Sequence, residues 1–131
     1  MNTLDKYISE LAEDTTLDEF TMKDVQMKLP AIKHKWAGRL IRSKIAVNQL
    51  QKKRNRTLNE MATRLITESP VKISRPLAKQ KVEEHEAIVE IDESISEEKA
   101  VIEFLEKAER ILNSMTFDIK NLTEIMKLET Q

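Results

Sequence analysis

The chain has 131 residues, of which 34% are charged, 40% are apolar and 4% are aromatic. One Gly and three Pro provide little of the turn chemistry that a β-sheet protein needs, and the absence of Cys excludes disulfides and thiolate chemistry. The formal net charge is only −1, yet residues 28–81 carry fifteen Lys and Arg against two acids, whereas residues 1–27 have a net charge of −5 and residues 82–131 one of −9. We therefore predict one mainly α domain with acidic N-terminal helices (1–29), a basic region (30–81) and acidic C-terminal helices (82–131).

The segregation of charge indicates a polyanion-binding site in the middle of the chain, pairing of the middle with the acidic arms, or both. The first residues lack the apolar core of a secretory signal, and no apolar run approaches the roughly 20 residues of a membrane-spanning helix. We expect a soluble cytoplasmic protein.

The N-terminal region predicts two short helices. Leu4, Ile8 and Leu11 recur at helical spacing and predict the first one. Thr16 and Glu19 have the spacing of a capping box, which favours a second helix that begins there. We expect Pro30 to end this second helix or to serve as the first residue of the next one.

One long helix is predicted over residues 31–67. Eight of its residues form an apolar stripe, interrupted at Ser43 and Arg54: Ile32, Trp36, Leu40, Val47, Leu50, Leu58, Met61 and Leu65. Six cations lie on the flank of that stripe: Lys35, Arg39, Arg42, Lys53, Arg56 and Arg64. Gly38 weakens a helix by about 1 kcal/mol relative to Ala, which predicts a bend or a close approach at this position.

The remainder of the chain predicts an irregular segment and further helices. Residues 71–76 are expected to be irregular, and a helix resumes from Leu77. The β-branched residues at 88, 89 and 91 favour locally extended backbone, and Ser94 and Glu97 have the spacing of another helix start. Val101, Leu105, Ala108, Leu112 and Met115 form an apolar stripe, and a final short helix is expected after residues 114–116.

Catalytic chemistry finds no support in the sequence. His34 and His85 are isolated from each other, and the acidic residues around His85 lack the spacing of a metal site. A single Gly excludes a glycine-rich phosphate loop. We therefore expect no catalytic residue, no metal, no cofactor and no enzymatic activity.

The basic region supports two interpretations of comparable weight. The run Lys52, Lys53, Arg54 and Arg56 can neutralise phosphates with release of counterions, which predicts sequence-tolerant, salt-dependent binding of nucleic acid. The same cations can instead form a solvated face, or pair with acids of the C-terminal region: Glu97, Glu98, Glu103, Glu106 and Glu109. Trp36 lies on the apolar stripe, so packing is favoured over base stacking.

The order of motifs resembles the UvsY family of phage recombination mediators. The resemblance covers nearly the whole chain. It is carried by Leu4-Asp5, Glu10-Leu11, Asp14, Leu17-Asp18 and Lys35-Trp36, by the basic residues Lys52–Arg54, and by the ending Phe117-Asp-Ile-Lys-Asn121.

The resemblance implies a helical protein that forms a ring of about six or seven subunits. It also implies sequence-independent binding of single-stranded DNA and the loading of a RecA-like phage recombinase onto DNA covered by the phage single-strand-binding protein. Residues 30–81 would then be the DNA-contacting region, and the location would be the cytoplasm of the infected bacterial host. The C-terminal helices would assemble the ring through ten residues: Val101, Phe104, Leu105, Ala108, Leu112, Met115, Phe117, Ile119, Leu122 and Ile125.

The sequence departs from the family after the basic run. Two basic positions of the family's DNA-binding motif are lost in the segment Leu58–Leu65. DNA contact is therefore expected from Lys52, Lys53, Arg54 and Arg56 first, then from Arg64, Lys72 and Arg75, or from the flank of Lys35, Arg39 and Arg42. The alternative is a helical scaffold or adaptor subunit of a phage assembly that does not bind DNA.

Overall fold

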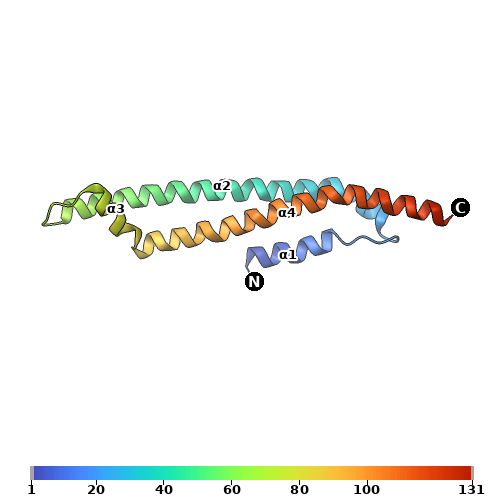
Figure 1. The fold of residues 1–131 in the computed structure, drawn as a ribbon, viewed down its shortest axis with the longest axis horizontal. Helices are drawn as coiled ribbons and strands as arrows, with labels where there is room; N and C mark the ends of the chain where they lie inside the picture. The colour runs from blue at the N-terminus through green and yellow to red at the C-terminus, as the bar shows by residue number, and fades with distance from the viewer. Residues whose placement is uncertain (1, 131) are drawn as a thin grey trace. The chain divides into compact units, whose positions relative to one another are not determined.

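The computed structural model describes residues 2–130, and its regular structure is helical throughout that range. It contains α1 (Thr3–Asp14), α2 (Met22–Glu68), α3 (Arg75–Glu83) and α4 (Glu86–Glu129) (Figure 1). The chain divides into two compact units, one made of Met1–Arg42 with Ala100–Gln131 and the other of Ser43–Lys99. No helix in residues 2–130 is both long enough and apolar enough to cross a membrane. The mainly α class predicted from the sequence is confirmed.

Local hydrogen bonds fix both ends of α1. The side chain of Asn2 accepts a hydrogen bond from the N–H of Asp5 at 2.8 Å, which caps the N-terminus. At the other end, the hydroxyl of Thr15 donates to the carbonyl of Leu11 at 2.7 Å and that of Thr16 to the carbonyl of Ala12 at 3.0 Å. Thr16 therefore closes α1 and does not begin the next helix.

Asp18 and Thr21 form the capping arrangement that was expected at Thr16 and Glu19. One carboxylate oxygen of Asp18 accepts from the N–H of Phe20 at 2.8 Å and from that of Thr21 at 2.9 Å. The hydroxyl of Thr21 accepts in return from the N–H of Asp18 at 3.3 Å. The backbone N–H groups of Thr21 and Phe20 lower the pKa of Asp18, because they stabilise the ionised carboxylate.

The long helix α2 begins at Met22 and passes through Pro30, so the predicted helix end at Pro30 is wrong. Pro lacks an N–H for the carbonyl four residues earlier, that of Gln26, and Gln26 is exposed, so water can reach it. Leu29 is buried and Ile32 packs against the same core, which favours helix on both sides of the proline. Gly38 causes no close approach, because a Cβ built there would lie 3.6 Å from the nearest atom, in the side chain of Arg42.

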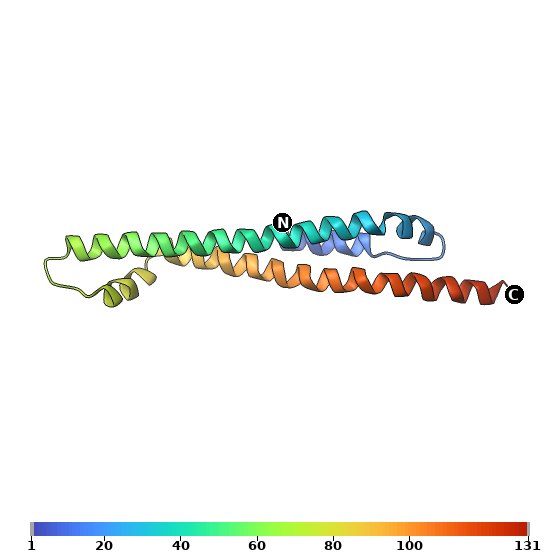
Figure 2. The ribbon, with the colours of Figure 1, turned by 90° about the horizontal axis from the view of Figure 1, so that it is seen from above.

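The second unit contains α3 and its connection to α2. An irregular segment was predicted at residues 71–76; the structure has residues 69–74 non-helical, and α3 begins at Arg75, two residues before the predicted Leu77 (Figure 2). The hydroxyl of Ser74 caps α3 by accepting from the N–H of Leu77. Ala62 of α2 and Ala78 of α3 have no exposed surface and pack in one cluster with Leu58, Val82 and Ile88. These two small side chains allow the helices to approach closely.

Helix α4 runs from Glu86 to Glu129 without the breaks expected at residues 94–97 and 114–116. The β-branched Ile88, Ile91 and Ile95 are helical because each is buried at 3–4 spacing. The same spacing continues through Leu112, Met115 and Ile119, so burial favours helix across residues 114–116. Serines 94 and 114 lie on the exposed side of α4.

The first unit packs around Trp36, whose side chain is only 1% exposed. Its ring meets Tyr7 of α1 and Phe104 of α4 edge to face, with centroids 5.6 Å and 6.3 Å away. Within this unit α2 and α4 are antiparallel, since Thr123 contacts Met22 whereas Thr116 contacts Lys33. The apolar stripes predicted for residues 32–40 and 101–115 meet in this core.

Candidate nucleic-acid interface

The cations of the basic region differ in whether acidic residues of the same chain bind them. Lys35 and Arg39 are bound by α1, and Arg54 is bound by α4. Of the others, Lys33 and Lys79 are half-buried and the rest are exposed. The basic region therefore contains Lys35 and Arg39 bound by α1, Arg54 bound by α4, and further cations that no acidic residue of residues 2–130 binds.

Lys35 and Arg39, which we call the latched pair, hold α1 against α2. The Lys35 ammonium lies 2.7 Å from a carboxylate oxygen of Asp14 and 3.7 Å from one of Glu10. The Arg39 guanidinium binds both oxygens of Glu10 and lies 4.6 Å from the ring centroid of Tyr7 and 4.7 Å from that of Trp36. These cations are engaged within the first unit and do not offer a free phosphate-binding flank.

Asp14 also accepts the indole hydrogen bond of Trp36 at 2.8 Å. Because the Trp36 ring is buried, this N–H needs a partner inside the protein. One carboxylate thus satisfies the buried indole and neutralises Lys35. The expected acidic partners in residues 97–109 are not the ones used, since the latched pair binds Glu10 and Asp14, and Glu103 binds Lys107 at 3.7 Å.

Arg54 interrupts the apolar stripe of α2 and reaches Asp92 on α4 in the second unit. Its Nε donates to one oxygen of Asp92 at 2.5 Å and its Nη2 to the other at 3.3 Å. The hydrogen bond that Arg54 donates to Asp92 raises the pKa of Arg54 above its usual value. Arg54 therefore joins two helices, which sets it apart from its basic neighbours.

Lys52, Lys53 and Arg56 form what we call the open cluster. All three are exposed, and none has an ion-pair partner within residues 2–130. Lys52 and Arg56 are four residues apart and share one helix face, while Lys53 lies on the neighbouring flank. This cluster has three positive charges available to an external anion.

The remaining candidate cations are spread over both units. Arg64 and Lys72 are exposed in the second unit, and Arg75 there donates to the hydroxyl of Thr63 at 2.9 Å. Arg42 is exposed on α2 and its guanidinium lies over Gly38. His34 and His85 are exposed, and no group of three or more possible metal-binding side chains occurs within residues 2–130.

The residues expected to assemble a ring divide into buried and exposed sets. Six of them are buried in the core of the chain itself: Val101, Leu105, Ala108, Leu112, Met115 and Ile119. Phe104 and Leu122 are half-buried, whereas Phe117 is 69% and Ile125 is 52% exposed. Leu128, which the sequence reasoning did not single out, is 72% exposed on the same helix. Leu128 lies three residues after Ile125, and this helical spacing could have identified it from the sequence.

The latched pair generates a stability prediction. Asp14→Ala leaves the buried indole N–H of Trp36 without its acceptor, so we expect the free energy of unfolding to fall by about 1–3 kcal/mol. Trp36 is the one Trp of the chain, so its fluorescence in a urea titration reports the unfolding directly. Glu13→Ala, an exposed neighbour on the same helix turn, is the control and is expected to change little. Equal losses for the two variants would contradict the role of Asp14.

Two comparisons with known proteins give matches over most of the chain. The family model described as "Recombination, repair and ssDNA binding protein UvsY" matches residues 10–130. A crystal structure of the bacteriophage T4 recombination mediator protein UvsY (lattice type IV) has a TM-score of 0.82 at 16% identity, covering 98% of this chain and 99% of that one. A second crystal structure of that protein (lattice type II) has a TM-score of 0.80 at 16% identity, with both chains covered in full.

No curated relative matches this chain in sequence. The structural likeness, at such low identity, concerns the fold, and the family assignment comes from the match over residues 10–130. The chain belongs to the UvsY family of recombination, repair and single-stranded-DNA-binding proteins.

Proposed function

We propose that this protein is a recombination mediator that binds single-stranded DNA without sequence preference. It helps a RecA-like phage recombinase to load onto DNA covered by the phage single-strand-binding protein. It acts in the cytoplasm of the infected bacterial host. The processes that it serves are homologous recombination and recombination-dependent repair and replication. It acts by binding and carries out no catalysis. The single observation that carries the proposal is the open cluster on the second unit of a UvsY-family chain.

Phosphate contact accounts for the expected lack of sequence preference. Lys52, Lys53 and Arg56 are long, exposed cations that can reach phosphates, and contacts to phosphates carry no sequence information. Trp36 is buried, and Tyr7 and Phe104 are half-buried against it, so these rings are not free to stack on successive bases. Affinity then depends mainly on counterion release and falls steeply with salt.

Mediator action follows from competition for the same strand. A strand held along the open cluster in a conformation that the covering protein does not bind shifts the equilibrium away from the covered form. The modest affinity of one subunit is multiplied when a single strand touches several subunits of one assembly. Assembly is therefore part of the proposed mechanism.

The assembly contact that we propose is the exposed apolar face of α4. Phe117, Ile125 and Leu128 are more than half exposed, on the helix whose opposite side is buried in the core. A groove of about 440 Å³ adjoins Phe117 and is lined by Gln26, Thr116, Phe117, Ile119, Lys120, Thr123, Glu124 and Lys127. A second copy of the chain is the occupant that we propose for this face, and the ring of six or seven subunits is built by repeating the contact.

The DNA proposal is tested with labelled oligo(dT) by fluorescence anisotropy over a range of salt concentrations. Replacing Lys52, Lys53 and Arg56 with Ala removes three phosphate contacts, so the slope of log affinity against log salt should become shallower by about 2. Arg54 is left intact because its bond to Asp92 joins two helices. The matched control replaces Lys99, Lys107 and Arg110, exposed cations of the acidic C-terminal region that do not line the proposed assembly groove, and should keep the wild-type slope.

Salt-independent binding, or equal slopes for the two triple variants, would contradict the open cluster as the DNA contact. A large oligomer with no affinity for oligo(dT) at low salt would favour the scaffold or adaptor instead.

The assembly proposal is tested by measuring mass in solution. Phe117→Ser with Ile125→Ser should reduce the oligomer to monomers or small species in sedimentation velocity, because the apolar area that holds the contact is lost. Ile8→Ser with Val71→Ser replaces two other exposed apolar residues, 48% and 69% exposed, and should leave the mass unchanged. A wild-type mass retained by the first variant would place the contact elsewhere.

A further inference from the structure

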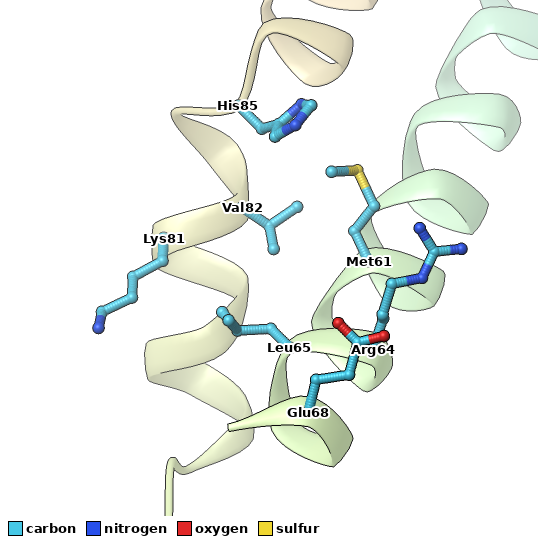
Figure 3. Close-up of a pocket in the computed structure, with 7 residues that line it drawn as sticks. All are labelled: Met61, Arg64, Leu65, Glu68, Lys81, Val82 and His85. Carbon is cyan, nitrogen blue, oxygen red and sulfur yellow. The ribbon is translucent and has the colours of Figure 1, made fainter. Parts of the chain in front are cut away.

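An open hollow lies between the last turns of α2 and α3 in the second unit (Figure 3). Its volume is about 410 Å³, and it is lined by Met61, Arg64, Leu65, Glu68, Lys81, Val82 and His85. Figure 3 shows Met61, Leu65 and Val82 directed into the space between the two helices, whereas Lys81 points away from α2. The floor of the hollow is apolar.

A cation lies beside this hollow, and the arrangement occurs twice on α2. Arg64 lines the hollow three residues after Met61. Lys53 lines a smaller hollow of about 280 Å³, three residues after Leu50. The two pairs are eleven residues apart, which is about three helical turns, so they lie on one flank about 16 Å apart along the axis. This flank therefore has a cation beside a hollow at two successive places; the larger hollow has an apolar floor, whereas Glu90 and Ser94 also line the smaller one.

We propose that this flank of α2 is the path of the single strand, and that the larger hollow takes a nucleobase while Lys53 and Arg64 bind phosphates. The inference rests on the proposed binding of single-stranded DNA and adds where the strand runs. A base has apolar faces and a polar edge, which matches an apolar floor with a polar rim. Met61 is half-buried, and its flexible thioether adapts to flat ligands.

The rim of the hollow gives the base and the phosphate different places. The Nδ1 of His85 accepts a hydrogen bond from the N–H of Ala87 at 3.0 Å, so the neutral ring carries its proton on Nε2. That N–H is available to an acceptor atom on the edge of a base, and every base has one. Arg64 and Glu68 are four residues apart on α2, so their opposite charges share one side of the hollow, and Arg64 is the cation there that can meet a phosphate.

The test compares oligo(dT) with an abasic strand of the same length, which keeps every phosphate and removes every base. We expect the wild type to bind oligo(dT) about fivefold tighter or more, whereas Met61→Gln should reduce that preference severalfold. Met27→Gln, at a position that is 73% exposed in the other unit, is the matched control and should keep the wild-type preference. Arg64→Gln should weaken both strands alike.

The outcomes separate this inference from the proposed function. If the wild type binds both strands equally and with strong salt dependence, the base site is excluded while single-stranded DNA binding stands. If it binds neither strand, both are excluded. If the preference exists but Met61→Gln retains it while remaining folded by circular dichroism, the base lies elsewhere. The comparison of the two strands with the wild type needs no variant. It therefore decides whether a base is bound even if Met61→Gln does not fold.

Discussion

The contact between α1 and α2 around Trp36 determines which positive charges the protein can offer. Asp14 accepts the buried indole hydrogen bond and also binds Lys35, while Glu10 binds Arg39, whose guanidinium stacks on Tyr7 and Trp36. Packing, hydrogen bonding and charge neutralisation thus occur at one place, and removing one partner leaves a buried polar group without compensation. The latched pair is therefore part of the core of the first unit, although its sequence is typical of a phosphate-binding flank.

The second unit divides its cations in the same way but leaves more of them open. Arg54 faces inward and is bound by Asp92 at two points, which makes it a link between α2 and α4. Lys52, two residues before Arg54, and Arg56, two residues after it, are exposed to solvent. Helical geometry alone separates these roles, since neighbours two positions apart lie on nearly opposite faces. Cations that join helices and cations open to solvent can therefore alternate within one basic run. We propose that the exposed ones bind single-stranded DNA.

Much of this arrangement could be predicted from the sequence. The helical class and the buried stripe through Trp36 and Leu40 follow from composition and spacing, and both are confirmed. The family resemblance came from the order of motifs along the chain, and the family match confirms it. Helix boundaries were harder, because burial of Leu29 and Ile88 overrides the local preferences of a proline and of β-branched residues. The partners of the cations could not be predicted, since pairing depends on which acidic segment packs against α2. The hollow formed by α2 and α3 depends on that packing too.

The central claim is that Lys52 and Lys53 are available to DNA, whereas Lys35 is held within the protein. Amine-selective labelling read out by mass spectrometry, with and without oligo(dT), tests it most directly. In the free protein Lys52 and Lys53 should label quickly and Lys35 slowly, because the ammonium of Lys35 is bound by Asp14. Added oligo(dT) should protect Lys52 and Lys53 and leave Lys35 unchanged. Fast labelling of Lys35 in the free protein, or protection of Lys35 in place of Lys52 and Lys53, would contradict the account.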